Sequence, residues 1–289
     1  MGRIPEKPTI WNWLLRQDLS GIHSCRTLLE GAAKACLGRD PVSAAAYTEA
    51  TATAFWNYVV EASADHAARG ISTSFAIADN TTKTWDCYPV PTGANSLKEE
   101  KALRVRSRPT YLRMIDNLND RQFEALSCVL LEALGSSEVE LTKGGGEGGI
   151  DAFGLILNAD SSHILGSPHH PLRVIAQSKM QSRPMGADKM KEFFETINEV
   201  KYGGEHKTEE VIPHWFRSSR GPIIGMAISD KGFQGGAEKR ARSRGILIVD
   251  SIDIAEVLAT TRTKYSSPDA CLARIAELLA KAPRTGPRP

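Results

Sequence analysis

A short polar motif, Gln177-Ser178-Lys179, follows an apolar stretch that begins at Leu172. The stretch predicts a buried strand over Leu172–Ser178. Residues two apart on a strand point to the same face, so the Gln177 amide and the Lys179 ammonium project side by side. A lysine at the end of a buried strand is costly unless an anion or a carboxylate compensates its charge. The motif therefore indicates that a negative group lies beside Lys179.

Asp151 is the carboxylate that the sequence offers to this motif. It begins a predicted strand, Ile150–Leu157, directly after the glycine-rich turn Lys143–Gly149. If the two strands pair as a hairpin, Asp151 and Lys179 can meet at one edge of the sheet. A carboxylate and a further oxygen can hold Mg²⁺, which neutralises a phosphate and lowers the pKa of a bound water. The lysine then orients that water or stabilises the transition state, so the arrangement suits phosphodiester hydrolysis. Glu124 is the candidate for a second carboxylate ligand.

Helices and strands alternate around these residues. Asn119-Asp120-Arg121-Gln122 predicts a capping box that opens a helix ending at Gly135. The later elements are strands at 138–142, 150–157, 172–178, 222–229 and 246–250, and helices at 187–200, 236–244 and 252–260. This order predicts an α/β fold, a mixed sheet with helices packed on its faces. One more amphipathic helix is expected at 269–281, before a basic, proline-rich end that we expect to be disordered.

These motifs, in this order and with these gaps, resemble the catalytic domain of Mrr-like restriction endonucleases, of the PD-(D/E)xK nuclease superfamily. The resemblance is carried by Phe123-Glu124-Ala125-Leu126, Leu130-Leu131, Leu134-Gly135, Thr142, Gly148-Gly149-Ile150-Asp151, Gln177-Ser178-Lys179, the segment Gly225–Phe233, Ala237, Ala241, Gly245 and Ile246–Asp250. It covers about half the chain and implies a restriction-endonuclease-like fold. Glu147 departs from the family, which more often has aspartate before Gly-Gly-Ile-Asp, and any role for that side chain is in doubt.

The resemblance also implies residue roles. Asp151 matches the metal-binding aspartate of the family and Lys179 matches its catalytic lysine. Gln177 stands where the wider superfamily has Asp or Glu and Mrr-like members commonly have Gln, and Glu124 matches the helix glutamate. The implied metal ligands are Asp151, Gln177 and Glu124. The implied cofactor is Mg²⁺, for which Mn²⁺ can substitute.

The first 108 residues have a different pattern, which predicts a mainly α-helical N-terminal domain. Helices are expected over 9–37 and from Asp40-Pro41 to Gly70, more extended chain over 71–92, and a linker or connecting helix over 93–108. We therefore expect three parts: 1–108, 109–262 as the nuclease domain, and 263–289 as a helix and basic tail. The N-terminal part has no readable role, and recognition, sensing and dimerisation all stay open.

Bulk composition restricts the class of protein. The formal net charge is only +2, so any DNA-binding surface must come from local clustering. Five scattered cysteines, with no C-x-x-C pair, indicate reduced thiols in a cytosolic protein rather than a zinc site or a disulfide framework. We expect no signal peptide and no membrane span, and hence a cytoplasmic protein.

Each of these features also has a purely structural explanation. Asp151 and Lys179 could form an ordinary salt bridge, and a glutamate such as Glu124 is favoured in the first turn of any helix by the helix dipole. The glycine turn lacks a following Gly-Lys-Ser/Thr, so a tight turn is favoured over a phosphate loop. Candidate DNA-phosphate contacts, which could equally be solvated side chains, are Lys143, Lys239, Arg240, Arg242 and Arg244.

A histidine pair and a set of aromatic residues also have structural explanations. His169-His170 could bind metal but has no matched third ligand, so a metal role is not favoured. Aromatic residues of the N-terminal part are expected in the core rather than as a base-stacking platform; these are Trp11, Trp13, Phe55 and Trp56.

Three functions follow from the sequence. The first is a metal-dependent DNA endonuclease, in restriction or anti-phage defence, acting as a homodimer or higher oligomer because cutting both strands needs two active sites. The second is a nuclease-fold subunit that binds DNA without cutting it, or that works only inside a complex. The third is a nuclease held inactive until a protein or small molecule signals through the N-terminal part. The presence of Asp151, Gln177 and Lys179 together favours the enzyme.

Overall fold

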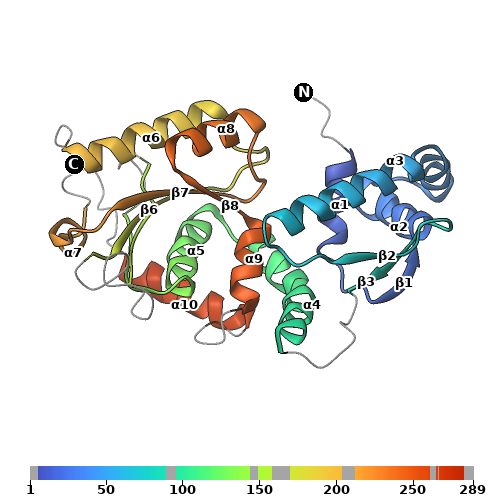
Figure 1. Ribbon diagram of the computed structural model, residues 1–289, viewed down its shortest axis with the longest axis horizontal. Helices are drawn as coiled ribbons and strands as arrows, with labels where there is room; N and C mark the ends of the chain where they lie inside the picture. The colour runs from blue at the N-terminus through green and yellow to red at the C-terminus, as the bar shows by residue number, and fades with distance from the viewer. Residues whose placement is uncertain are drawn as a thin grey trace. The chain divides into compact units, whose positions relative to one another are not determined.

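The computed structural model describes residues 6–88, 96–143, 149–157, 170–203, 212–260, 265 and 267–282. The chain forms two compact units, Met1–Arg113 and Met114–Pro289, each with its own sheet (Figure 1). The division falls in the last turn of helix α4 (Ser96–Asp116). The separate roles assigned to residues 1–108, 109–262 and 263–289 stay predictions.

The first unit packs helices on one face of a three-stranded antiparallel sheet in the order β1-β3-β2. Its elements are α1 (Glu6–Leu14), β1 (Gly21–Ser24), α2 (Cys25–Leu37), α3 (Pro41–Ala68), β2 (Phe75–Asp79), β3 (Thr84–Cys87) and α4. Trp56 of α3 stacks on Trp85 of β3 with ring centroids 4.5 Å apart. The unit is thus mainly helical, as expected, and its core is aromatic, with Trp11, Phe55 and Trp56 all buried.

The expectation of one helix over residues 9–37 is wrong. α1 ends at Leu14, and the chain then turns through Gly21, whose φ of 81° is in the left-handed region, into β1. Ser24 starts α2, because its side chain accepts a hydrogen bond from the N–H of Thr27. The capping position Asp40 is confirmed: its carboxylate accepts from the N–H groups of Val42 and Ser43 at 3.0 Å.

The second unit has a five-stranded mixed sheet in the order β4-β5-β6-β7-β8. The strands are β4 (Ser136–Leu141), β5 (Ala152–Ile156), β6 (Leu172–Lys179), β7 (Ile223–Ser229) and β8 (Leu247–Asp250). The first three pair antiparallel and the last three pair parallel. The expected α/β mixed sheet flanked by helices is therefore confirmed.

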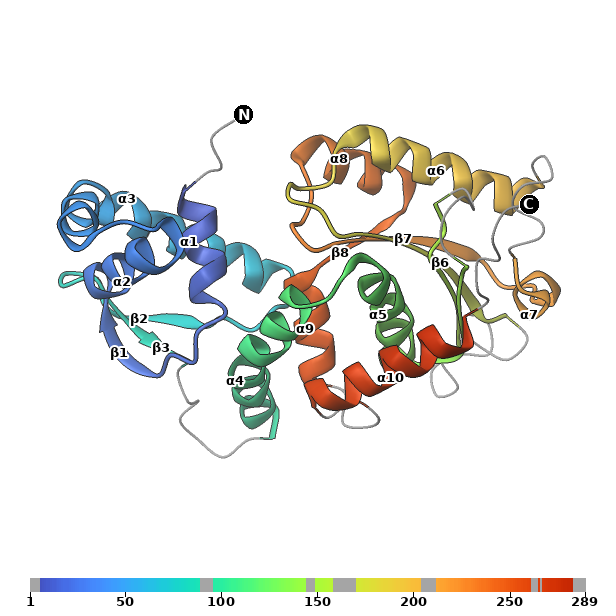
Figure 2. The ribbon, with the colours of Figure 1, turned by 180° about the vertical axis from the view of Figure 1, so that it is seen from behind.

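Helices cover both faces of this sheet. α6 (Ala187–Tyr202) and α8 (Gly235–Arg244) lie on one face, and α5 (Asp120–Ala133) and α10 (Pro268–Lys281) lie on the other (Figures 1 and 2). α9 (Ser251–Thr260) follows β8 and contacts α5. The short α7 (His214–Ser218) was not expected from the sequence. Side chains of β5, β6 and β7 form a core with α6 and α8, in which Phe153, Ile175, Phe193 and Ala227 are fully buried.

The C-terminal helix is attached to the second unit by polar contacts as well as by packing. Glu132 of α5 accepts hydrogen bonds from the Arg274 guanidinium and from the Tyr265 hydroxyl. The basic end that we expected to be disordered, from residue 283 onward, lies outside the described residues. No helix among the described residues combines the length and the apolar character needed to cross a bilayer.

Candidate active site

The site is built where two antiparallel strands and one helix meet. Ala152 of β5 pairs with Ala176 of β6, and the Asp151 N–H donates to the Ala176 carbonyl at 2.9 Å. This is the hairpin expected from the sequence. Asp151 thus lies just before β5, next to the strand that ends in Gln177-Ser178-Lys179.

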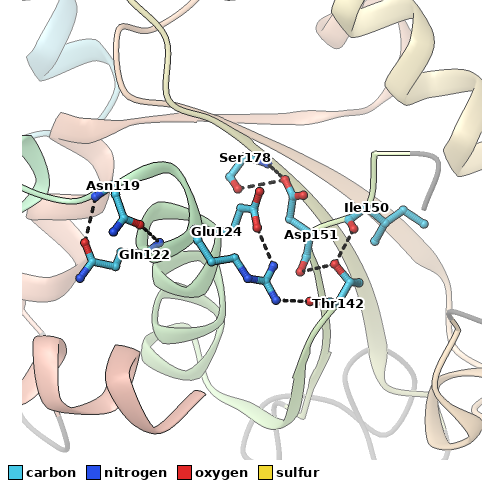
Figure 3. A network of polar contacts seen from close by, with 8 residues as sticks. Asn119, Gln122, Glu124, Thr142, Ile150, Asp151 and Ser178 are labelled. Atoms are coloured by element: carbon cyan, nitrogen blue, oxygen red, sulfur yellow. Dashed lines mark hydrogen bonds and ion pairs between the residues drawn. The ribbon is translucent and has the colours of Figure 1, made fainter. Parts of the chain in front are cut away.

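The Asp151 carboxylate is held by the middle residue of that motif. Its Oδ2 accepts from the Ser178 N–H at 2.6 Å and from the Ser178 hydroxyl at 3.0 Å (Figure 3). The side chain is buried, with 7% of its surface exposed. The pKa of Asp151 is raised to about 6: burial is the main cause, Glu124 adds to it, and the Ser178 donors and Lys179 act in the opposite direction. A carboxyl in this position releases its proton only near neutral pH, unless a cation takes the place of that proton.

Glu124 faces this carboxylate from α5 (Figure 3). The capping box that starts α5 is formed as expected, since Asn119 accepts from the Gln122 N–H and Gln122 accepts from the Asn119 N–H. Glu124 follows in the first turns, where it pairs with Arg121 at 2.6 Å. Its negative charge is one of the causes that raise the pKa of Asp151.

Gln177 offers an oxygen without a partner. Its amide nitrogen donates to the Gly149 carbonyl at 2.7 Å, which fixes the orientation of the amide. Its Oε1 is buried and has no hydrogen-bond partner among the described residues. A buried acceptor left without a donor is costly, so it is a good position for a cation. Gly149 makes this approach possible, because a Cβ there would lie 2.3 Å from the Gln177 amide nitrogen, and its φ of 82° suits glycine.

Oxygens of Asp151, Glu124 and Gln177 are the ligand type that Mg²⁺ and Mn²⁺ take. Asp151 and Glu124 face each other (Figure 3), whereas the Gln177 amide is held at the Gly149 turn. Among the residues that the structure describes, no group of three His, Cys, Asp or Glu side chains is arranged for a metal. The candidate set instead combines two carboxylates with one amide.

Strand alternation separates the motif residues. Gln177 and Lys179 share a face of β6 with Ile175, which packs against the side chains of α6, whereas Ser178 points to the opposite face. Lys179 is still close enough to Asp151 to lower its pKa. The structure thus brings Asp151, Glu124 and Lys179 into electrostatic contact and places Gln177 at the Gly149 turn.

Besides Ser178, two residues of the site were given no role by sequence reasoning. Arg121 bridges Glu124 and the Thr142 carbonyl, to which it donates at 2.5 Å. Thr142 in turn donates its hydroxyl to the Ile150 carbonyl at 2.8 Å, which fixes the chain just before Asp151. Thr142 belongs to the motif that carries the family resemblance, so a signal was present for it. Arg121 stands within the capping-box sequence and had no other signal.

The other candidate positions lie apart from these contacts. Lys143 is exposed directly after β4, and Lys239, Arg240, Arg242 and Arg244 are exposed on α8. His169 and Glu147 lie outside the described residues. Four of the five cysteines are buried, and burial raises the pKa of Cys25 to about 11 and of Cys87 to about 12, so these thiols are poor nucleophiles.

Comparison with known proteins agrees with this geometry. Residues 115–208 match the family model of the Mrr catalytic domain, described as restriction endonuclease. The fold and the site define a nuclease domain of the restriction-endonuclease type. The matched segment contains all four candidate site residues, Glu124, Asp151, Gln177 and Lys179.

Solved structures similar to this chain include three restriction endonucleases. MspJI, in complex with a 27-mer oligonucleotide, is 14% identical, with a TM-score of 0.41, over 68% of this chain and 41% of that chain. The DNA modification-dependent AspBHI is 15% identical, with a TM-score of 0.38, over 67% and 45%. FokI is 13% identical, with a TM-score of 0.36, over 90% and 46%. The present chain thus spans less than half the length of each. Curated protein sequences gave no match.

Proposed function

We propose that this protein is a metal-dependent endonuclease that hydrolyses phosphodiester bonds of DNA in restriction or anti-phage defence. The observation that carries the proposal is the buried Asp151 carboxyl, held beside a Gln-x-Lys strand end within the segment that matches the Mrr catalytic family. The hydrogen-bond partner of the Asp151 carboxylate is Ser178, the residue between Gln177 and Lys179.

Asp151, Gln177 and Glu124 would hold Mg²⁺, or Mn²⁺ in its place. When bound, the cation neutralises phosphate charge and activates water for attack. Ser178 orients the Asp151 carboxylate, and Arg121 restrains Glu124. Lys179, at the end of β6, would use its ammonium to stabilise the negative charge that develops on the phosphate during hydrolysis.

The remaining parts of the proposal concern partners and setting. Lys143 and the basic residues of α8 would contact DNA phosphates, which supply affinity without sequence preference. Cutting both strands requires two sites, so we propose a homodimer or higher oligomer on DNA. Residues 1–108 would recognise DNA, an activating protein or a small-molecule signal. Buried, free thiols suit the reducing cytoplasm.

Plasmid cleavage tests the proposal. Purified protein is incubated with methylated and unmethylated supercoiled plasmid in Mg²⁺ or Mn²⁺, together with Asp151→Ala and Lys179→Ala. Lys281→Ala, at an exposed lysine on the last helix, is the matched control. We expect the wild type and the control to nick or linearise the plasmid and both site variants to fail. Equal activity in all four proteins would reject the assigned site. DNA binding without cleavage under every metal would favour a subunit that binds DNA but does not cut it.

A further inference from the structure

A small groove lies between α6 and α8, on the face of the sheet opposite α5. It has a volume of about 180 Å³ and is lined by Met190, Lys191 and Phe194 of α6 and by Arg240, Ser243 and Arg244 of α8. Three of these six side chains are cationic. The groove is therefore a concave site with one sign of charge, which concentrates anions.

One wall of the groove is held in place. The Arg244 guanidinium lies over the Phe194 ring at 4.4 Å from its centroid, an arrangement that orients the side chain without consuming its hydrogen-bond donors. Ser243 donates to the Arg240 carbonyl at 2.9 Å. A guanidinium fixed in this way loses less conformational entropy when it binds an oxyanion.

The cations of the groove are not neutralised from within. Lys191 pairs with Glu195 at 3.6 Å, but both side chains are more than half exposed, so water screens the pair. Within the described ranges, Arg240 and Arg244 have no carboxylate at salt-bridge distance. An external anion can therefore use both guanidinium groups.

Both helices that line the groove begin beyond the ends of strands at the sheet edge that carries Lys179. β6 and β7 run parallel, with Lys179 opposite Ser229, and α6 and α8 follow their ends. The loops between are joined by hydrogen bonds of Met185 with Gly232 and with Gln234. The helices then start side by side, because a Cβ at Gly236 would lie 3.5 Å from that of Ala187.

The length of the groove suits a nucleic-acid strand. The lining residues extend from Met190 to Phe194 on α6 and from Arg240 to Arg244 on α8, which is about 6 Å on each helix at the helical rise of ~1.5 Å per residue. Phosphates of one strand of duplex DNA are spaced at ~3.4 Å along the helix axis, so the groove spans about two nucleotides.

We infer that the α6–α8 groove binds the phosphodiester backbone of the DNA flanking the cut, through Lys191, Arg240 and Arg244. The inference rests on the proposed nuclease function for the identity of the anion. It separates the basic residues of α8 into two pairs: Arg240 and Arg244, which line the groove, and Lys239 and Arg242, which do not. Only the first pair is placed to bind phosphate tightly.

The two pairs provide a matched test. Arg240→Gln/Arg244→Gln and Lys239→Gln/Arg242→Gln remove the same charge from the same helix. Binding of a labelled 30-base-pair duplex is measured by fluorescence anisotropy at several salt concentrations, in EDTA so that no cleavage occurs. Each lost phosphate contact lowers the slope of log K against log salt by ~0.9. We expect Arg240→Gln/Arg244→Gln to lower the slope by about 1.8 and the DNA affinity by about 10- to 100-fold. We expect Lys239→Gln/Arg242→Gln to lower the slope by less than about 0.5.

The inference would be overturned if the two double variants lost the same DNA affinity and salt slope, or if Arg240→Gln/Arg244→Gln lost neither. Melting curves check that each variant is folded, and Arg244→Lys, which keeps the charge, should keep the slope. Polyglutamate serves as a second probe: if the groove pair loses affinity for polyglutamate but not for DNA, the partner is an acidic protein segment and the inference fails. DNA binding is measured without cleavage, so this test is independent of catalysis. If the protein cleaves no DNA but its DNA binding depends on the groove, the nuclease proposal fails and the inference about the groove stands.

Discussion

Replacing Asp151 by asparagine should stabilise the protein in the absence of metal at neutral pH. The folded pKa of Asp151, about 6, lies above the ordinary carboxyl value of 3.8, mainly because the group is buried. A raised carboxyl pKa means that protonation favours the folded state. The contribution of protonated Asp151 to the free energy of unfolding is fully present below about pH 4 and is lost as the pH rises through about 6.

The size of the effect follows from this difference. A shift of roughly two pKa units corresponds to about 3 kcal/mol at ~1.36 kcal/mol per unit, and this is the cost of ionising Asp151 in the folded protein above pH 6. Asparagine is neutral, keeps an oxygen that can accept from the Ser178 N–H and hydroxyl, and avoids this cost. For a domain of this size, about 3 kcal/mol raises Tm by about 5 to 10 °C.

The assay is thermal unfolding in EDTA at pH 7.5 and at pH 4, for wild type, Asp151→Asn and the exposed control Asp269→Asn. We expect Asp151→Asn to melt higher than wild type at pH 7.5 and near it at pH 4, with no such pattern for the control. Mg²⁺ or Mn²⁺ should raise the Tm of the wild type and leave Asp151→Asn nearly unchanged. If Asp151→Asn melts at or below the wild type at pH 7.5, the reasoning about this carboxyl is refuted.

Three further changes test the contacts around the site and the C-terminal helix. Ser178→Ala removes one donor to Asp151, so calorimetry should show Mn²⁺ binding weakened by about 3- to 10-fold, with recovery in Ser178→Thr; unchanged affinity would exclude the orienting role. Gly149→Ala places a methyl group 2.3 Å from the Gln177 amide nitrogen at a position of positive φ. Denaturant melts should show that the free energy of unfolding falls by about 1 to 2 kcal/mol, and metal binding should weaken. Unchanged stability and metal binding in this variant would contradict the prediction. Glu132→Ala leaves the Arg274 guanidinium without its main carboxylate and should lower stability by about 2 to 3 kcal/mol, detected as a lower denaturant midpoint; an unchanged midpoint would show that α10 does not need this contact.

Much of the nuclease domain could be predicted from the sequence, because its signals are local. The capping box at Asn119, the glycine after α5, and the apolar runs of β6 and β7 each determine an element without help from distant residues. The hairpin of β5 and β6 was the condition on which Asp151 could meet Lys179, and the two strands do pair.

The N-terminal error has a physical cause. Apolar spacing continues from Leu15 through Ile22 to Cys25, so periodicity alone extends the helix. Ile22, however, is 70% exposed on β1, and the pattern there does not mark a buried face. Arg108 shows the opposite case: it belongs to a charged stretch expected to be a linker or a connecting helix, yet it is fully buried and donates to the Ser74 hydroxyl and the Ser72 carbonyl. Sequence pattern cannot indicate such burial, because the partners are more than thirty positions away.

The candidate site divides in the same way. The spacing of Gln177 and Lys179 predicted that they share one face of a strand, and Asp151 was the carboxylate predicted to lie beside Lys179. It did not predict that Ser178 would hold Asp151, because Asp151 precedes β5 and its side chain follows no strand alternation. The pairing of Arg121 with Glu124 also depends on the Thr142 carbonyl, which comes from another element.

Single-turnover cleavage of a short end-labelled duplex by excess protein tests the central claim most directly. Wild type and Lys179→Ala are compared in Mn²⁺, with DNA affinity measured separately in EDTA. We predict a rate for Lys179→Ala at least ~10²-fold lower than wild type at nearly unchanged DNA affinity, because the ammonium acts on charge that develops in the transition state. Equal cleavage rates in the two proteins would contradict the account, since the strand end at Lys179 would then take no part in the reaction.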